Sequence, residues 1–138
     1  MAIVTTCAPL VVVVDDDTLY LSLMVETLDE AGYVTLTDTR TTGAIARLGD
    51  ATPALVILDL QIEEEDAGLT VLWGLRLHPR LENVPVLICS ANAEYLYTHR
   101  DDLAALGCTT LAKPFNLDAM LALVHDTMTH PPRVSCMS

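Results

Sequence analysis

Residues 10–17 read Leu10-Val11-Val12-Val13-Val14-Asp15-Asp16-Asp17. The first five are apolar and mostly β-branched, which predicts a strand buried on both faces, as in a parallel sheet covered by helices. A second apolar run, Leu55-Val56-Ile57-Leu58, also ends in an acid, Asp59. We therefore expect two buried strands that each deliver carboxylates to the rim where the carboxyl ends of the strands meet.

Strands and helices are expected to alternate five times. Alternation of this kind predicts right-handed crossovers and a parallel sheet. The predicted fold is a doubly wound (βα)5 domain of the α/β class, with a five-stranded parallel sheet and helices on both faces. The expected strands are residues 10–14, 34–36, 54–58, 84–89 and 109–112, and the expected helices are residues 17–31, 41–49, 69–77, 93–106 and 117–130.

The composition describes one acidic domain. A chain of 138 residues can bury one core, and we expect an N-terminal extension (1–9), the domain (10–130) and a short tail (131–138). The net charge of −12 argues against direct nucleic-acid binding. No apolar stretch approaches the ~18 residues of a membrane helix, and residues 1–7 carry no positive charge for a signal peptide. A cytoplasmic protein without membrane contact is expected.

Two further polar residues follow later strands. Ser90 comes after the fourth apolar run and Lys113 after the fifth, so both should share the rim with the acids. Acids about 4 Å apart repel by on the order of 1 kcal/mol in water, so Asp15, Asp16 and Asp59 are expected to hold a cation or a proton. Hard oxygen ligands suit Mg²⁺.

These residues suit transfer of a phosphoryl group to a carboxylate. Both groups are negative, so attack requires a divalent cation that screens the approach. Lys113 would balance the remaining charge, and the Ser90 hydroxyl would donate to a phosphoryl oxygen. The sequence thus predicts a Mg²⁺-dependent phosphoryl-transfer site.

The chain resembles the receiver domain of response regulators, the CheY-like phosphoacceptors of two-component signalling systems. The resemblance runs from Leu10 to about Met128, and its five motifs, in order, are highly specific. It implies a flavodoxin-like fold and a signalling domain that catalyses only its own phosphorylation and dephosphorylation. The motifs are Val13-Val14-Asp15-Asp16-Asp17, Leu58-Asp59-Leu60, Asp66-Ala67-Gly68-Leu69, Pro85-Val86-Leu87-Ile88-Cys89-Ser90-Ala91 and Lys113-Pro114-Phe115.

The resemblance also implies the acceptor and the metal ligands. Asp59 would accept the phosphoryl group. Asp16, Asp59 and the backbone carbonyl of Gln61 would bind Mg²⁺, and Asp15 would act mainly through water. The donor would be a phosphohistidine on a sensor histidine kinase or a histidine phosphotransfer protein.

Two other residues complete the implied site. Ser90 would be the switch hydroxyl, and Lys113 would be the lysine that receivers place beside the acceptor. The peptide bond between Lys113 and Pro114 is often cis in this family, and X-Pro bonds lose most of the preference for trans. A cis bond there would turn the lysine back over the site.

Two positions depart from the family pattern. Glu63 stands where receivers usually have proline, within the acidic loop Glu63-Glu64-Glu65-Asp66, and Thr110 replaces the usual switch aromatic. Extra acids near the acceptor should disfavour a phosphoryl group and favour a cation. Tyr95 or Tyr97 would then substitute in part for the missing aromatic.

We expect a stand-alone receiver, because the chain after the last helix leaves no room for an output domain. Phosphorylation would shift the balance between conformations of the face made by the fourth helix, the fifth strand and the fifth helix. This shift would alter contact with an unidentified downstream protein. The protein is expected to be a monomer or a homodimer.

Two alternatives stay open. A haloacid-dehalogenase-like phosphatase would use Asp15-x-Asp17 as its catalytic motif, but it would leave Asp59 without a role. A phosphorylation-independent receiver-like adaptor is suggested by Glu63 and Thr110.

Overall fold

The computed structural model describes residues 8–60, 67–113 and 116–129. Five parallel strands form one sheet in the order β2-β1-β3-β4-β5. This order confirms the predicted doubly wound, flavodoxin-like fold. The strands are β1 (Leu10–Val14), β2 (Val34–Asp38), β3 (Leu55–Asp59), β4 (Val86–Ser90) and β5 (Cys108–Ala112).

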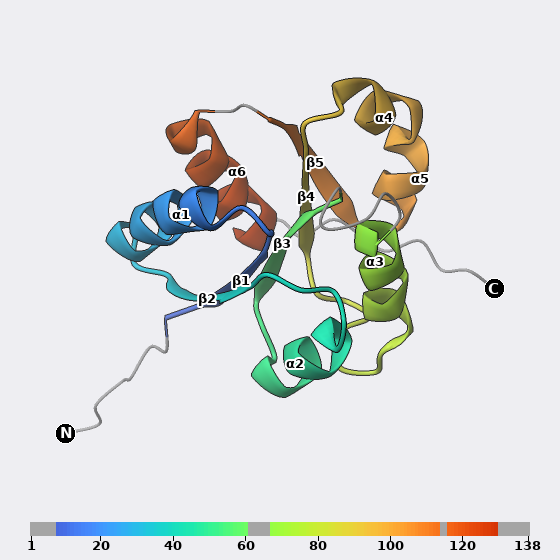
Figure 1. Cartoon of the computed structure of the whole chain (residues 1–138), viewed down its shortest axis with the longest axis horizontal. Coiled ribbons are helices and arrows are strands. Elements are labelled where there is room, and N and C mark those ends of the chain that lie inside the picture. The colour runs from blue at the N-terminus through green and yellow to red at the C-terminus, as the bar shows by residue number, and fades with distance from the viewer. Residues whose placement is uncertain (1–7, 61–66, 114–115, 130–138) are drawn as a thin grey trace.

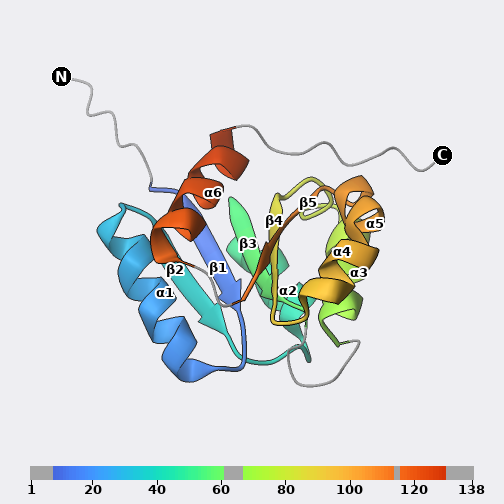
Figure 2. The same cartoon turned by 90° about the horizontal axis from the view of Figure 1, so that it is seen from above.

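The helices cover both faces of the sheet (Figures 1 and 2). Helices α1 and α6 lie on one face, and α2, α3, α4 and α5 lie on the other. Asp17 begins α1 by accepting a hydrogen bond from the backbone N–H of Tyr20, as its place after β1 suggests. The helices are α1 (Thr18–Glu30), α2 (Ala44–Ala51), α3 (Ala67–Leu77), α4 (Ala93–Thr98), α5 (Arg100–Ala105) and α6 (Leu117–Thr129).

The valines of β1 pack into two separate hydrophobic cores, one on each face of the sheet. Val11 and Val13 pack with residues of α1 and α6, whereas Val12 and Val14 pack with residues of α2 and α3. Successive side chains of a strand point to opposite faces, so a central strand needs apolar residues at every position. The unbroken apolar run therefore places Asp15 at the edge of both cores.

One expected helix is divided in the structure. Residues 93–106 were predicted as a single helix, but α4 ends at Thr98 and α5 begins at Arg100. His99, between them, has φ −102° and ψ 14°, outside the helical region. Asp101 and Asp102 then fall in the first turn of α5, where acids favour the helix dipole. The prediction of one continuous helix was wrong at this residue.

Gly68 brings the start of α3 against the end of β3. A Cβ at this position would lie 2.5 Å from the Cα of Leu60 and 2.6 Å from its carbonyl oxygen. Only glycine allows so close an approach without displacing the backbone. The first turn of α3 is thereby held beside the residue that follows Asp59.

Within the described ranges, every helix is too short or too polar to cross a membrane.

Candidate functional site

Three carboxylates converge at the carboxyl ends of β1 and β3. Asp15 follows β1 and is 3% exposed, and Asp59 ends β3 and is 8% exposed. One oxygen from each of Asp15, Asp16 and Asp59 lies within 4.8 Å of the others. Asp16 is exposed, so the cluster opens to solvent on one side. The rim predicted from the sequence is therefore formed by the folded chain.

Lys113 lies between the two buried acids. Its Nζ donates to Asp15 Oδ2 at 2.7 Å and to Asp59 Oδ2 at 3.4 Å. Burial alone would lower the pKa of Lys113, but the hydrogen bonds and charges of Asp15 and Asp59 outweigh burial and raise the pKa above its ordinary value. The ammonium group is therefore charged, and it offsets part of the negative charge of the cluster.

The backbone pairing of β5 with β4 positions Lys113 beside the carboxylates. The N–H of Lys113 donates to the carbonyl of Ser90 at 2.8 Å, so the pairing of β5 with β4 continues up to the lysine. Ser90, the last residue of β4, is 1% exposed. In the register of the sheet Cys89 is the partner of Asp59, so Ser90 lies one position further along the same rim.

The Ser90 hydroxyl is linked to the start of α4. Its Oγ accepts a hydrogen bond from the N–H of Asn92 at 3.0 Å. Asn92 Oδ1 in turn accepts from the N–H of Tyr95 at 3.0 Å and thereby caps α4. Two hydrogen bonds thus connect the rim with the first turn of that helix.

Tyr20 is a site residue that the sequence analysis missed. Lys113 Nζ lies 4.3 Å from the centroid of its ring, within the range of a cation–π interaction. Burial, and then the negative charges nearby, raise the pKa of Tyr20 above its ordinary value. The available signal was its position in the first turn after the Asp17 cap, which places its side chain near the rim.

The donor set fits Mg²⁺. The three carboxylates are hard oxygen ligands, and they are gathered closely enough to share one ion. The neighbouring sulfur of Cys89 does not compete, because burial raises the pKa of this thiol to about 12 and keeps it protonated. An acidic triad of this kind is typical of the Mg²⁺ site of receivers.

Several predicted features lie outside the described residues. They are the Gln61 ligand, the acidic loop of residues 63–66 and the peptide bond between Lys113 and Pro114. Their roles stay predictions.

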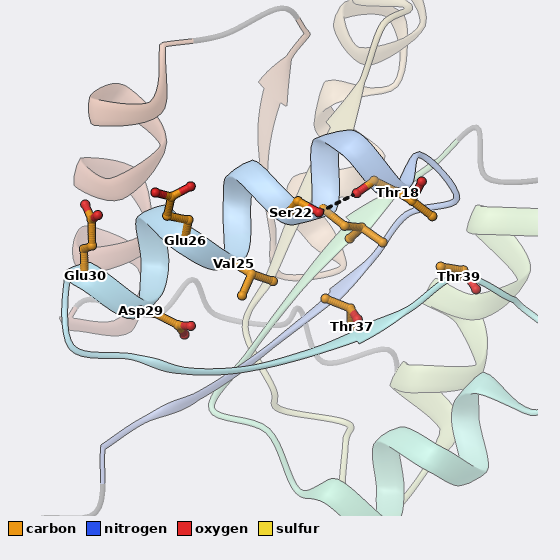
Figure 3. A pocket seen from close by; sticks show the side chains of 9 residues that line it. Thr18, Ser22, Val25, Glu26, Asp29, Glu30, Thr37 and Thr39 are labelled. Atoms are coloured by element: carbon orange, nitrogen blue, oxygen red, sulfur yellow. Dashed lines mark hydrogen bonds between the residues drawn. The ribbon is translucent and has the colours of Figure 1, made fainter.

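A hollow of 670 Å³ lies along α1, against Thr37 and Thr39 (Figure 3). Its wall carries hydroxyls and the acids Glu26, Asp29 and Glu30. None of Asp15, Asp59 and Lys113 lines this hollow. It is therefore a concavity separate from the carboxylate cluster.

The fold and the site together define a receiver. The sequence pattern of the response regulator receiver domain matches residues 11–125. The chain therefore belongs to the response regulator receiver family, as the sequence motifs indicated, and it is a phosphoacceptor signalling module. Membership of this family implies a histidine kinase as partner.

Particular relatives support this assignment. The transcriptional regulatory protein KdpE of Mycobacterium tuberculosis is 32% identical over 116 residues, which are 82% of this chain and 48% of KdpE. The chain thus spans about half the length of the curated relatives it matches.

Solved structures share the fold. The chemotaxis response regulator CheY4 of Vibrio cholerae superposes with a TM-score of 0.76 at 22% identity, over 86% of this chain and 98% of CheY4. A CheY-like receiver domain protein of Methanospirillum hungatei gives 0.73 at 18% identity, over 89% of this chain and 95% of that protein.

Proposed function

We propose that Asp59 accepts a phosphoryl group from a phosphohistidine in a Mg²⁺-dependent reaction, and that the domain signals through protein contacts that depend on this modification. The observation that carries the proposal is the position of the Lys113 ammonium group, which bonds to both Asp15 and Asp59. A cation held between two buried carboxylates is suited to a site where further negative charge arrives.

Each residue has a distinct task in this proposal. Asp59 presents its carboxylate as the nucleophile and also binds the ion together with Asp16 and the carbonyl of Gln61. Asp15 assists mainly through water. Mg²⁺ bound there supplies positive charge that screens the approach of two anionic groups. Lys113 then contacts a phosphoryl oxygen, and the Ser90 hydroxyl donates to another.

The output would pass through the segment of α4 and α5. Ser90, Asn92 and Tyr95 are joined by the two hydrogen bonds described above, so a hydroxyl that turns toward a phosphoryl group disturbs the cap of α4. The face of α4, α5, β5 and α6 is where we expect a partner to sense this change. The proposal includes a receiver domain over residues 10–130 that acts in the cytoplasm.

Phosphorylation can be tested with a small phosphodonor and Mg²⁺. Intact-mass measurement should show one added phosphoryl group on the native protein and none on Asp59→Asn. Beryllofluoride with Mg²⁺ should likewise bind the native protein only, as followed by fluorine NMR. Equal labelling of the two proteins would refute Asp59 as the acceptor.

The phosphatase alternative is not supported by the family assignment. In addition, the second acid of its Asp15-x-Asp17 motif serves as the N-cap of α1. The phosphorylation-independent adaptor is separated from the proposal by Mg²⁺ affinity, because an adaptor with a degenerate site should bind the ion poorly.

A further inference from the structure

An apolar groove of 330 Å³ separates α3 from α4 and α5. We call it the α3–α5 groove. Its wall on one side is formed by Leu69 and Trp73, and on the other by Tyr95, Leu103 and Leu106, with Asp102 at the edge. Its lining residues come from α3, α4, α5 and the residues that join them to their neighbours. Helices α3, α4 and α5 lie on the same face of the sheet, and α6 lies on the other (Figure 2).

Aromatic and aliphatic surface is left open at this groove. Trp73, the single tryptophan of the chain, is 48% exposed. Leu77, one helical turn further along α3, is 80% exposed, so residues 69, 73 and 77 form a stripe at helical spacing. Exposed tryptophan beside an apolar groove is a frequent anchor at protein interfaces.

The charge around the groove favours a basic occupant. Asp102 lines the groove together with His99, whose Nδ1 lies 3.9 Å from Asp102 Oδ2. Asp101 precedes Asp102 in the first turn of α5, and the whole chain carries a net charge of −12. A Lys or Arg of a partner would pair with these acids and stack on the Trp73 ring.

A second copy of the chain is a poorer partner than a basic helix, although Arg40 and Arg80 are exposed among the described residues. Arg47 is held by Asp38, Arg76 by backbone carbonyls and Lys113 by the acids of the rim. Arg100 lies on the ring of Tyr97. Two copies would also bring together like charges of −12 each.

The groove is connected to the acceptor site. Tyr95 lines it, and its ring lies tilted against that of His99 with centroids 4.3 Å apart. The N–H of Tyr95 donates to Asn92 Oδ1, and the N–H of Asn92 donates to Ser90 Oγ. Two successive hydrogen bonds therefore join the Ser90 hydroxyl to Tyr95 in the wall of the groove, so that a change at the hydroxyl can alter the position of Tyr95.

We propose that the α3–α5 groove is an output surface that binds a basic amphipathic helix of a partner protein, with an affinity set by the state of Asp59. The dependence on Asp59 rests on the function proposed above, whereas the docking itself does not. An apolar stripe of the helix fills the groove, and its flanking Lys and Arg side chains face Asp101 and Asp102.

Trp73 provides a direct measurement. The probe is a peptide of leucine and lysine at helical spacing, about 18 residues long so that it can form a helix. We expect saturable change in Trp73 emission with this peptide. A scrambled peptide of the same composition and a leucine–glutamate peptide should give none. Equal binding of all three would overturn the proposal.

Two alanines of α5 give a matched pair of variants. Ala105 lines the groove and is exposed, whereas the adjacent exposed Ala104 does not line it. Ala105→Lys and Ala104→Lys alter the net charge equally and keep Trp73. We expect about tenfold weaker binding for Ala105→Lys and little change for Ala104→Lys. If both variants weakened peptide binding equally, the peptide would be binding to the acidic surface in general, and the α3–α5 groove would be wrong as the docking site.

The link to Asp59 is tested by adding beryllofluoride and Mg²⁺. We expect the dissociation constant of the peptide to change by about fivefold or more, and not to change in Asp59→Asn. If fluorine NMR shows bound beryllofluoride while the affinity stays constant, the output role is wrong and the proposed function stands. If beryllofluoride does not bind Asp59, the proposed function fails, and the two alanine variants still decide the docking site.

Discussion

The two rims of the sheet each hold a partly buried cation, but the partners differ in kind. At the carboxyl ends of the strands, Lys113 bonds to the carboxylates of Asp15 and Asp59. At the opposite rim, Arg76 donates to backbone carbonyls in the segments that lead into β4 and β5, among them those of Val84 and Leu106. One cation faces charged groups that an incoming ligand can rearrange, and the other faces neutral groups that are fixed by the fold.

The difference in partners indicates that Lys113 serves ligand binding and that Arg76 serves the stability of the fold. An excess of carboxylates around Lys113 leaves negative charge that a metal ion can neutralise, so this rim is open to ligands. Arg76 donates to the carbonyl oxygens of Leu81, Val84 and Leu106 and so adds to the hydrogen bond that Leu81 accepts from the N–H of Val84. Burial lowers the pKa of Arg76, although its ordinary pKa is so high that the guanidinium stays charged. Its rim is therefore expected to be structural.

Removing Arg76 should have the largest effect on folding. Arg76→Met removes the guanidinium donor from the carbonyls of Val84 and Leu106 and one of two donors from that of Leu81, and we expect a loss of about 2–4 kcal/mol in the free energy of unfolding. Arg80→Met, an exposed position, is the control and should stay within about 0.5 kcal/mol. Urea titrations measure both. If Arg76→Met lowered the free energy of unfolding only slightly, water would be hydrogen-bonding to these carbonyls as well as the guanidinium does.

The folded Arg76→Met protein should still accept a phosphoryl group on Asp59. Its labelling by a small phosphodonor, measured below the unfolding transition, is expected to match the native rate within about twofold. A large fall in this rate would mean that the two rims are coupled, and the separation of roles would be wrong.

At the carboxylate rim, removal of a charged side chain should raise the stability of the metal-free protein, whereas removal of Arg76 should lower it. Asp16→Asn removes one of three clustered charges, so without Mg²⁺ we expect the protein to gain about 1 kcal/mol in stability. Added Mg²⁺ should stabilise the native protein by mass action and the variant much less, and labelling of Asp59 should be lost. Thermal unfolding with Mg²⁺ and with a chelator measures these changes.

Asp17→Asn is the matched control for Asp16→Asn. It removes the same charge one residue later, and asparagine keeps the N-cap of α1. We expect its response to Mg²⁺ to remain native. If Asp16→Asn instead destabilised the metal-free protein, the acids would be structural partners, and the contrast between the rims would disappear.

The sequence predicted the parts of the fold that depend on local pattern. Apolar runs located the strands, and the polar residues at their ends located Asp15, Asp59, Ser90 and Lys113 on one rim. It missed contacts between residues far apart in the chain, such as Arg76 with Leu106, because no periodicity encodes a side chain that crosses to another loop. The break at His99 was also missed, since neither glycine nor proline marks it.

Tyr20 was missed although its place in the first turn after Asp17 was a usable signal, and its contribution to the labelling rate should be the smallest. Its ring lies against the Lys113 ammonium group, and such contacts contribute roughly 0.5–1 kcal/mol at partly exposed sites. Tyr20→Phe keeps the ring and should label at the native rate. Tyr20→Leu should be about two- to fivefold slower, because Lys113 is held less firmly near the acceptor.

A double-mutant cycle decides whether the ring acts through the lysine. In a Lys113→Ala background the ring has no ammonium group to hold, so Tyr20→Phe and Tyr20→Leu should label Asp59 at equal, low rates. If Tyr20→Leu still lowers the rate relative to Tyr20→Phe there, the ring acts by packing against α1 and its neighbours. In that case the charge balance at this rim would depend on the carboxylates and Lys113 without the aromatic ring, which would make the contrast with the neutral partners of Arg76 sharper.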